Sequence, residues 1–259
     1  MRAAWKAILN WRASACLLAP LLSAPALAAA GALVTPSGPE VPENLLRIEL
    51  HLDTPLSAPL DMRRVVLLDG AGAPIEDAFL DLPLADPDGR AVALLLHPGR
   101  IKTGVGPNLA LGTALHAGQA VRLRIDDPQL GGVVEKQWRV APPLRQLINP
   151  QRWTVHAVKR HGRQPLRIAF PAALDGDAAA LIALQGPDGR RVAGTARLLS
   201  GEREWRFAPA LAWRPGTYLL RLHPRLEDPQ GNRLCSAFEQ SGQGSQACAE
   251  EGRLEFIID

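Results

Sequence analysis

The sequence predicts an all-β protein made of two antiparallel β-sandwiches in tandem. Three observations support this fold class: apolar and polar residues alternate over short segments, turn motifs recur between those segments, and the 259-residue chain contains an internal repeat. Many short strands separated by turns are typical of sandwiches, because each strand buries one face against a second sheet.

The N-terminal segment has the organisation of a secretory signal peptide. Three basic residues begin it, an uncharged run follows from Cys16 to Leu27, and Ala26-Leu27-Ala28 or Ala28-Ala29-Ala30 fits an A-x-A cleavage signal. A retained membrane anchor is the alternative, but the apolar run is short and two prolines interrupt it. We take residues 1–28 as the cleaved signal peptide, and we expect a periplasmic or secreted protein with no membrane span after cleavage.

The charge balance argues against a polyanionic partner. The chain has 29 basic and 26 acidic residues, and Arg2, Lys6 and Arg12 lie in the leader. The remaining chain therefore has no formal net charge, and nothing attracts it globally to nucleic acid.

An internal repeat divides the rest of the chain. Residues 44–50 (NLLRIEL) align with residues 164–170 (QPLRIAF), and residues 117–126 (AGQAVRLRID) align with residues 215–223 (PGTYLLRLH). The repeat predicts two domains, at residues 31–140 and 152–259. A proline-bounded linker at 141–151 joins them, and a loop at 99–115 is inserted in the first.

Each copy reads as a series of strands. Residues 47–53 alternate strictly, with Ile48 and Leu50 on one face and Arg47 and Glu49 on the other. A period of two with one apolar face indicates a strand whose other face is in water. Further strands are predicted at 119–125, 218–222 and 254–258. Turns are predicted at 69–70, 86–89, 186–189 and 228–231, and no stretch shows helical periodicity except a possible turn near 175–181.

The turn motifs of the second copy resemble a known domain family. They are residues 170–175 (FPAALD), residues 215–218 (PGTY) and residues 226–232 (LEDPQGN). Together they resemble the bacterial Ig-like domain of the type found in surface-layer proteins, and the first copy resembles it less, with Ala120 where Tyr218 would fall. The resemblance implies two tandem Ig-like domains, a fold that serves as spacer, adhesin or enzyme accessory.

Three residues of these motifs are assigned structural roles. Tyr218 is expected to form a tyrosine corner, in which the hydroxyl bonds to the backbone upstream of its strand. Asp228 and Asn232 are expected to close their own turn. Calcium ligation is the alternative for this pair, although one turn does not provide the six or more oxygens that calcium needs.

Cys235 and Cys248 are the cysteines that remain after cleavage of the leader. A pair of cysteines in an exported chain predicts a disulfide. Zinc binding is the alternative, but two further ligands at suitable spacing are missing.

The inserted loop is the candidate site for binding a partner. Its Arg100, Lys102, Thr103 and Asn108 offer cations and polar groups on what we expect to be an exposed loop. A phosphate-binding loop is excluded, because the lysine and threonine do not follow the required glycine spacing.

No catalytic motif emerges from the sequence. His51 shares a strand face with Glu49 and Asp53, a pattern that the solvent face of a sheet also produces without function. Glu202 and Glu204 are expected on an exposed strand. The tryptophans, by contrast, are expected to fill the cores (Trp138, Trp153, Trp205 and Trp213).

We therefore predict a non-enzymatic extracytoplasmic structural or binding module without a cofactor, whose partner is an envelope protein or a glycan. One alternative is a periplasmic metal-handling protein of the copper-binding sandwich type, although soft ligands are scarce. Another is a hydrolase with a site between the domains, for which His97, His116 and a carboxylate would have to converge.

Overall fold

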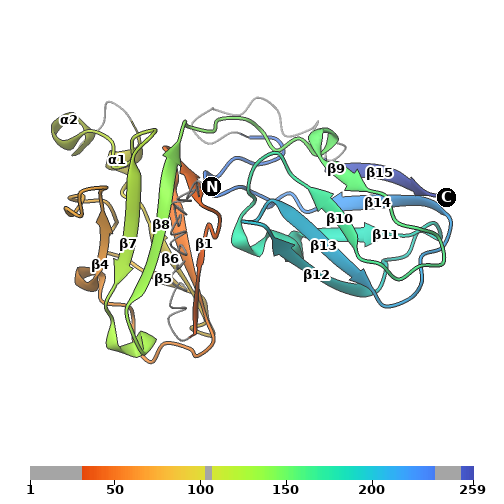
Figure 1. The fold of residues 1–259 in the computed structure, drawn as a ribbon, viewed down its shortest axis with the longest axis horizontal. Coiled ribbons are helices and arrows are strands. Elements are labelled where there is room, and N and C mark those ends of the chain that lie inside the picture. Colours follow the sequence, from red (N-terminus) through yellow and green to blue (C-terminus); the bar gives the residue numbers. More distant parts are fainter. Residues whose placement is uncertain (1–30, 103–106, 237–251) are drawn as a thin grey trace, which may run out of the picture.

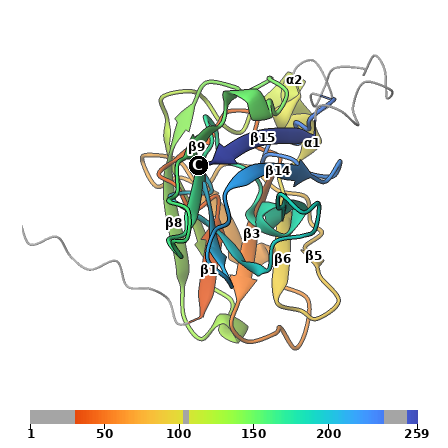
Figure 2. The same cartoon turned by 90° about the vertical axis from the view of Figure 1, so that its right-hand side faces the viewer.

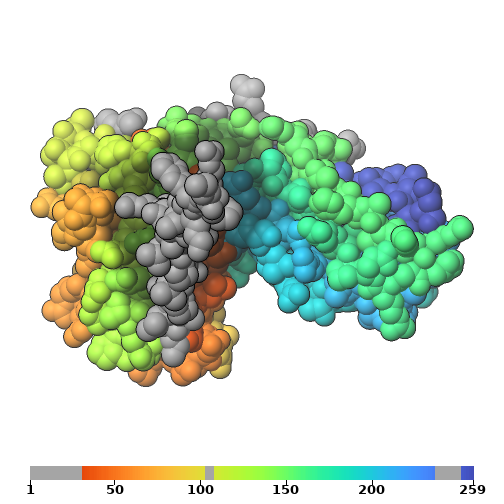
Figure 3. All heavy atoms as spheres, in the orientation of Figure 1, coloured from red at the N-terminus to blue at the C-terminus, as the bar shows by residue number. Residues whose placement is uncertain are grey.

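A computed structural model of the chain describes residues 31–102, 107–236 and 252–259. These residues form two β-sandwiches in tandem (Figure 1), and the space-filling view shows them as two lobes (Figure 3). Viewed along the long axis of the molecule, the second sandwich lies in front of the first (Figure 2). The all-β fold class is confirmed.

The first sandwich packs a sheet of order β1-β3-β6-β5 against a sheet of order β2-β8-β7-β4. Its strands are β1 (Ala32–Thr35), β2 (Glu40–Pro42), β3 (Arg47–Leu52), β4 (Val65–Leu68), β5 (Leu84–Ala85), β6 (Ala91–Leu95), β7 (Ala120–Ile125) and β8 (Val134–Ala141).

The second sandwich packs a sheet of order β12-β13-β10-β9 against a sheet of order β11-β14-β15. Its strands are β9 (Thr154–His156), β10 (Leu166–Ala169), β11 (Ile182–Gln185), β12 (Gly194–Leu199), β13 (Glu204–Pro209), β14 (Gly216–Leu222) and β15 (Arg253–Ile258).

Both sandwiches have the immunoglobulin strand order. When the strands of the second sandwich are lettered A to G along the chain, its sheets read D-E-B-A and C-F-G, as in an Ig constant-type domain. The first sandwich has the same order with one extra strand, β2, which pairs in parallel with β8. The strand pairs of the described sheets are antiparallel, as predicted, with this one parallel pair as the exception. The chain crosses from one sheet to the other between β1 and β2, and β2 then runs in the same direction as the last strand.

The internal repeat corresponds to this common topology. Residues 44–50 contain most of β3 and residues 164–170 contain β10, and each of these is the B strand of its sandwich. The second aligned pair contains β7 and β14, each of which is the F strand. The same apolar alternation therefore builds the same central strand in both copies.

Each sandwich has its own hydrophobic core. The first core is almost entirely aliphatic, with Trp138 as its buried aromatic side chain. The second contains a series of aromatic rings in contact, with centroid separations of 5.3 to 6.2 Å from Trp205 through Phe207, Trp213 and Tyr218 to Phe256. All four tryptophans expected in the cores are buried.

Helices are short and lie at loops. The structure places α1 (Pro98–Ile101) and α2 (Pro107–Leu111) in the inserted loop, which the sequence predicted to be free of helix. Single 3-10 turns are η1 (Met62–Arg64), η2 (Pro128–Leu130) and η3 (Pro150–Arg152), and the longer η4 (Gly176–Leu181) lies where a turn was expected. In the described ranges, no helix is long and apolar enough to cross a membrane.

Candidate functional site

The polar face of β3 does not face water. Arg47, Glu49 and His51 alternate with buried apolar residues along this strand, as predicted, and they point at the second sandwich. The expectation of a solvent face is wrong here, because the second sandwich covers the sheet. We call this region the junction. It comprises Thr35, Ser37, Gly38, Asn44, Leu46, Arg47, Glu49, His51 and Lys136 of the first sandwich, Leu144 of the linker, and Asp175, Gly176, Asp177, Gly201, Glu202, Glu227, Pro229, Asn232 and Arg233 of the second.

Arg47 is the central cation of the junction. Its Nη2 donates to Asp175 Oδ2 and to Glu227 Oε1, the latter at 2.6 Å, and its Nε donates to Glu49 Oε1 at 3.0 Å. Burial by itself lowers the pKa of Arg47, but the three carboxylates outweigh it and raise the pKa above its usual value. The guanidinium therefore stays charged and links β3 to two loops of the other sandwich.

Glu49 is the least satisfied group of the junction. Its side chain is 15% exposed, and its buried Oε2 has no hydrogen-bond partner in the described structure. The ring of His51 lies beside that oxygen, with its Nε2 3.6 Å away. Burial and the neighbouring Asp175 raise the pKa of Glu49 to about 7, so that the carboxyl is about half protonated at neutral pH.

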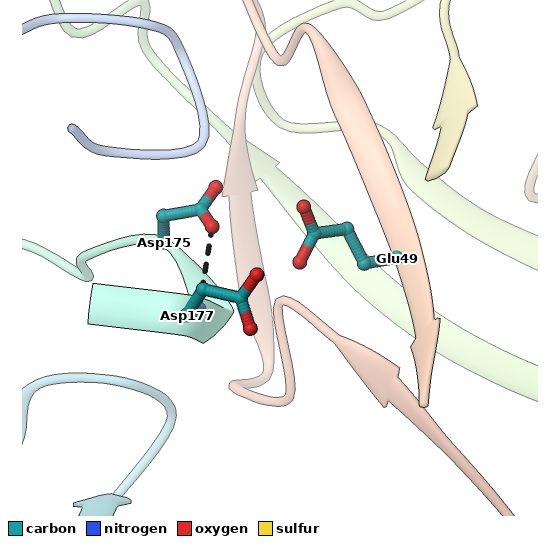
Figure 4. Close-up of side chains that lie close together, drawn as sticks. All are labelled: Glu49, Asp175 and Asp177. Carbon is teal, nitrogen blue, oxygen red and sulfur yellow. Dashed lines mark hydrogen bonds between the residues drawn. The ribbon is translucent and has the colours of Figure 1, made fainter. Parts of the chain in front are cut away.

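Three carboxylates converge beside Arg47. Oxygens of Glu49, Asp175 and Asp177 lie within 4.8 Å of one another (Figure 4). Asp175 is already engaged on both oxygens, by Arg47 and by the backbone N–H of Asp177 at 3.3 Å. Burial raises the pKa of Asp175 as well. The guanidinium thus supplies the positive charge that this acidic group requires. A carboxylate set of this kind also lacks the soft ligands that copper prefers.

Gly176 lets the two sandwiches approach closely at this point. A Cβ built on Gly176 would lie 3.0 Å from His51 Nε2, 3.1 Å from Glu49 Oε2 and 3.1 Å from Thr35 Oγ1. Each of these separations is tighter than an ordinary contact. Where η4 meets the polar face of β3, a side chain in place of this glycine would have to displace the ends of these three side chains.

The linker is fixed to both sandwiches at Leu144. Asn44 of the first sandwich donates to Leu144 O at 2.8 Å and accepts from Leu144 N at 2.9 Å. Asn232 of the second sandwich donates to the same carbonyl at 3.1 Å. One linker residue therefore connects an asparagine from each sandwich.

A second set of contacts lies at the loop between β1 and β2. Ser37 donates its backbone N–H and its hydroxyl to the carboxylate of Glu202, at 2.8 and 2.6 Å, and Lys136 Nζ donates to Ser37 O at 2.5 Å. Gly38 and Gly201 pack backbone to backbone beside this carboxylate. The expectation that Glu202 and Glu204 lie on an exposed strand is wrong. Both are buried, the first against Ser37 and the second between two arginines (Arg167 and Arg206).

Asp228 and Asn232 close their turn and also reach the junction. Asp228 Oδ1 accepts from the backbone N–H of Gln230 and Asn232, and Oδ2 accepts from the Asn232 side chain at 2.9 Å. Burial raises the pKa of Asp228 to about 6. Because every carboxylate oxygen already has a donor, the geometry is that of a capped turn rather than of a calcium loop. Leu46 N also donates to Pro229 O at 3.1 Å across the junction.

Tyr218 has the geometry of a tyrosine corner. Its hydroxyl donates to Arg214 O at 3.0 Å and accepts from Arg214 N at 3.2 Å. Tyr218 lies near the start of β14, which is the F strand where Ig-like domains place this residue.

The inserted loop differs from the exposed binding loop that the sequence predicted. Arg100 is only 5% exposed and donates to Thr113 O at 3.5 Å, because α1 turns it inward. The expectation of an exposed cation at this position is therefore wrong. Lys102 is exposed, Asn108 is half-buried in α2, and Thr103 lies outside the described residues.

The two histidines that flank this loop have local roles. His97 caps α1 by accepting the Gly99 N–H at 3.0 Å, and the His116 ring bonds the Thr113 hydroxyl at 3.2 Å. Neither belongs to the junction that joins the sandwiches, so the geometry of the described residues gives no support to a hydrolase site between the domains. Cys248 and residues 1–30 lie outside the described part of the chain, so the disulfide with Cys235 and the signal peptide stay predictions.

Sequence reasoning missed most of the junction. Ser37, Asn44 and Asp175 gave no sign of a contact between the sandwiches, since their partners lie more than 90 positions away in the chain. A usable signal was present on β3, where three ionisable side chains share one face of a central strand. Ionisable side chains that share one face of a central strand destabilise the fold unless groups of opposite charge lie against them.

No known protein family matches the chain, and no curated protein matches it. Among solved structures, it is similar to a chimeric titin Z1Z2 carrying a decorin peptide, with 11% identity, a TM-score of 0.23, and coverage of 88% of this chain and 95% of that one. It is also similar to latent PorU from Porphyromonas gingivalis, with 14% identity and a TM-score of 0.26. The match covers 85% of this chain and 19% of that one. A third similar structure is native alpha-2-macroglobulin from Escherichia coli, with 11% identity and a TM-score of 0.25. The match covers 84% of this chain and 86% of that one. The Ig-like classification rests on the strand order and not on these scores.

Proposed function

We propose that this chain is a non-enzymatic extracytoplasmic structural and binding module, which presents two Ig-like sandwiches to a partner as one rigid tandem. The observation that supports the proposal most is the junction. A linker between domains normally leaves them free to move. Here a linker residue, a buried ion-pair network and two glycine contacts all connect the sandwiches.

Rigidity follows from the chemistry of these contacts. Moving the sandwiches apart would break the bonds from Ser37 to the Glu202 carboxylate and from Arg47 to Asp175 and Glu227. It would also separate Asn44 and Asn232, which bind the same linker residue. Water would replace the lost partners, so each hydrogen bond contributes a net of about 0.5–1.5 kcal/mol, and each bond to a charged group about 1.5–3 kcal/mol. Such a tandem suits a spacer or a platform of fixed geometry, because a partner that binds both sandwiches loses no entropy in ordering them.

Residual dipolar couplings on the ¹⁵N-labelled mature chain test the rigidity. We expect the couplings of both sandwiches to fit one alignment tensor. The double variant Asn44→Ala/Asn232→Ala, which removes both linker contacts, should require two tensors, whereas Gln137→Ala on the exposed face of β8 should behave as the wild type. Two independent tensors for the wild-type protein would overturn the proposal.

The compartment and the family are part of the same proposal. We propose a periplasmic or secreted location, a fold of the surface-layer Ig-like type, and an envelope protein or a glycan as partner. The basic leader with its A-x-A signals supports export, and the Cys235/Cys248 pair supports an oxidising compartment.

Fractionation of cells expressing the tagged full chain checks the location. We expect the protein outside the cytosol, with its N-terminus at residue 29 or 31 and with both cysteines blocked to alkylation before reduction. A cytosolic protein that keeps its leader and whose Cys235 and Cys248 are both alkylated without reduction would contradict the proposal.

A further inference from the structure

A row of basic side chains crosses the outer face of the second sandwich. The register of the sheet β12-β13-β10-β9 sets one basic residue of each strand opposite the next, and the strands lie side by side (Figure 1). In order across the sheet, these residues are Arg197, Arg206, Arg167 and His156. The residues on either side of Arg167 and Arg206 along their strands belong to the core, so the row lies on the opposite, outer face. We call these basic side chains the cationic row.

The cationic row carries more positive charge than its own strands offset. Like charges at opposed positions destabilise a sheet, because neighbouring strands are only about 4.7–4.9 Å apart. One acidic residue, Glu204, occurs in β9, β10, β12 and β13. Its Oε2 accepts from Arg167 Nη2 at 2.7 Å, and its Oε1 accepts from Arg206 Nη2 at 3.0 Å. A single carboxylate in these strands therefore faces the guanidinium groups of the row, and positive charge remains in excess.

Hydrogen-bond donors of the row remain available to a ligand. Arg197 is exposed, and it has no hydrogen-bond or ion-pair partner among the residues that the structure describes. Arg167 and Arg206 bind Glu204 through Nε and Nη2, which leaves Nη1 of each without a partner in the described ranges. Their side chains are 49% and 34% exposed. Because the buried Glu204 orients both guanidinium groups, the row is preorganised for a ligand with negative charge.

The surroundings of the row argue against a nucleic acid as this ligand. A single-stranded nucleic acid binds through aromatic side chains on which its bases stack. The aromatic residues of these strands are Trp205 and Phe207, and both lie in the core. The outward residues beside the row are small instead, as at Ala169, Thr195 and Ala208. The described face is therefore a shallow charged surface without stacking groups.

The spacing of the row argues against an extended acidic peptide. Side chains on one face of an extended peptide recur about every 6.6–6.8 Å, which is the length of two residues. The strands that carry the row are only about 4.7–4.9 Å apart. A sugar unit that is linked through its opposite sides lengthens a glycan by close to that strand spacing. Successive sugars can therefore each face one guanidinium group of the row.

We propose that the cationic row binds an anionic glycan, which runs across the strands and carries a carboxylate or a sulfate group on successive sugar units. Each anionic group accepts hydrogen bonds from a guanidinium group of the row, as the Glu204 carboxylate does. The chain after residue 28 has no formal net charge, so this attraction is local, and salt screens it. The proposal rests on the proposed function and deepens it, because it names the chemistry of a glycan partner.

Two tetrasaccharides that differ in charge test the proposal. Tetragalacturonate carries a carboxylate on every sugar, and its methyl ester has the same sugar chain without the charges. Titrations of the ¹⁵N-labelled mature chain should shift the amide signals of Arg167, Arg197 and Arg206. The acid should bind at least about tenfold more tightly than the ester, since one charged hydrogen bond is worth about that factor. The affinity should fall as sodium chloride is added.

Sulfated maltotetraose, titrated beside tetragalacturonate, distinguishes the two anionic groups. The tighter ligand shows which group the row prefers, and neutral maltotetraose should bind more weakly than both. Binding of neutral maltotetraose as tight as that of the anionic sugars would contradict a role for charge.

Arg197→Gln removes one cation of the row without breaking a contact of the described structure. We expect an unchanged melting temperature and an affinity for tetragalacturonate that is about fivefold to tenfold lower, because the lost contact is exposed to solvent. Arg139→Gln is the matched control, since it removes an exposed arginine from β8 of the first sandwich and changes the net charge equally. Its affinity should equal that of the wild type.

Wild-type affinity of Arg197→Gln, or an equal loss in Arg197→Gln and Arg139→Gln, would overturn the row as the binding site. The peptide acetyl-tetraglutamyl-amide carries as many carboxylates as tetragalacturonate, and equally tight binding of this peptide would overturn the glycan as the ligand. These outcomes differ from failure of the proposed function, because the dipolar couplings of the free protein report the rigid tandem and cell fractionation reports the location.

Discussion

Replacing Glu49 with glutamine tests the electrostatics of the junction. Burial and Asp175 raise the pKa of Glu49 from its ordinary value of 4.5 to about 7. The folded protein therefore holds this proton more tightly than the unfolded chain does. The stabilisation is complete below pH 4.5 and is lost as the pH rises through 7. Glutamine mimics the protonated carboxyl, so the Glu49→Gln variant should not lose this part of the stability.

The structure gives the size of the effect. The difference between 4.5 and about 7 corresponds to about 3 kcal/mol, at 1.36 kcal/mol for each pH unit. The side chain is only 15% exposed, so solvent screens little of this energy. The groups that face Glu49 are Thr35, Arg47, His51, Asp175 and Asp177, and all of them remain in the variant.

Urea unfolding at pH values from 4 to 8.5 measures the effect. The two proteins should be about equally stable near pH 4.5, and the variant should exceed the wild type by about 3 kcal/mol above pH 8. Asp228 has a pKa raised to about 6, so its titration also lowers the stability of the folded protein as the pH rises. Both proteins contain Asp228, so the difference between their stabilities reports Glu49. Glu255→Gln on the exposed face of β15 serves as the control. Parallel pH profiles for the wild type and Glu49→Gln would show that the Glu49 carboxyl does not titrate with a raised pKa in the folded protein.

Three further substitutions test single contacts by urea unfolding or calorimetry. Gly201→Ala should lower the free energy of unfolding by about 2 kcal/mol, because the φ of +68° disfavours a side chain and the added Cβ would lie 2.7 Å from the Cα of Gly38. Gly38→Ala, whose Cβ would make an ordinary 3.5 Å contact, should change the free energy of unfolding little. Equal losses of stability in the two variants would contradict this prediction. Asn232→Ala should cost about 1–3 kcal/mol by leaving buried acceptors in the turn and the linker, and an unchanged melting temperature would exclude that role. Tyr218→Phe should cost about 1 kcal/mol through its lost bonds to Arg214, and a neutral result would show that the ring alone matters.

Several strands and turns could be predicted from the amino-acid sequence alone. Alternation on residues 47–53 and the repeat of that pattern in the second copy depend on neighbours along one strand, so they can be read locally. The predicted turns at 186–189 and 228–231 likewise form within four residues, as the bonds from Gly189 N and Gly231 N show. Which strands share a sheet is not local. For this the sequence offered only the resemblance of the second copy's motifs to an Ig-like family, and the strand order itself came from the structure.

The cover over the polar face of β3 could not be predicted from the sequence. Arg47 could be read as a solvated residue because its partners, Asp175 and Glu227, lie 128 and 180 positions away. Arg100 could be read as exposed because two short helices in the inserted loop leave no periodic signal. The physical reason is the same in both cases: side-chain alternation shows which face of a strand is polar, whereas burial of that face depends on segments that meet only in the folded chain.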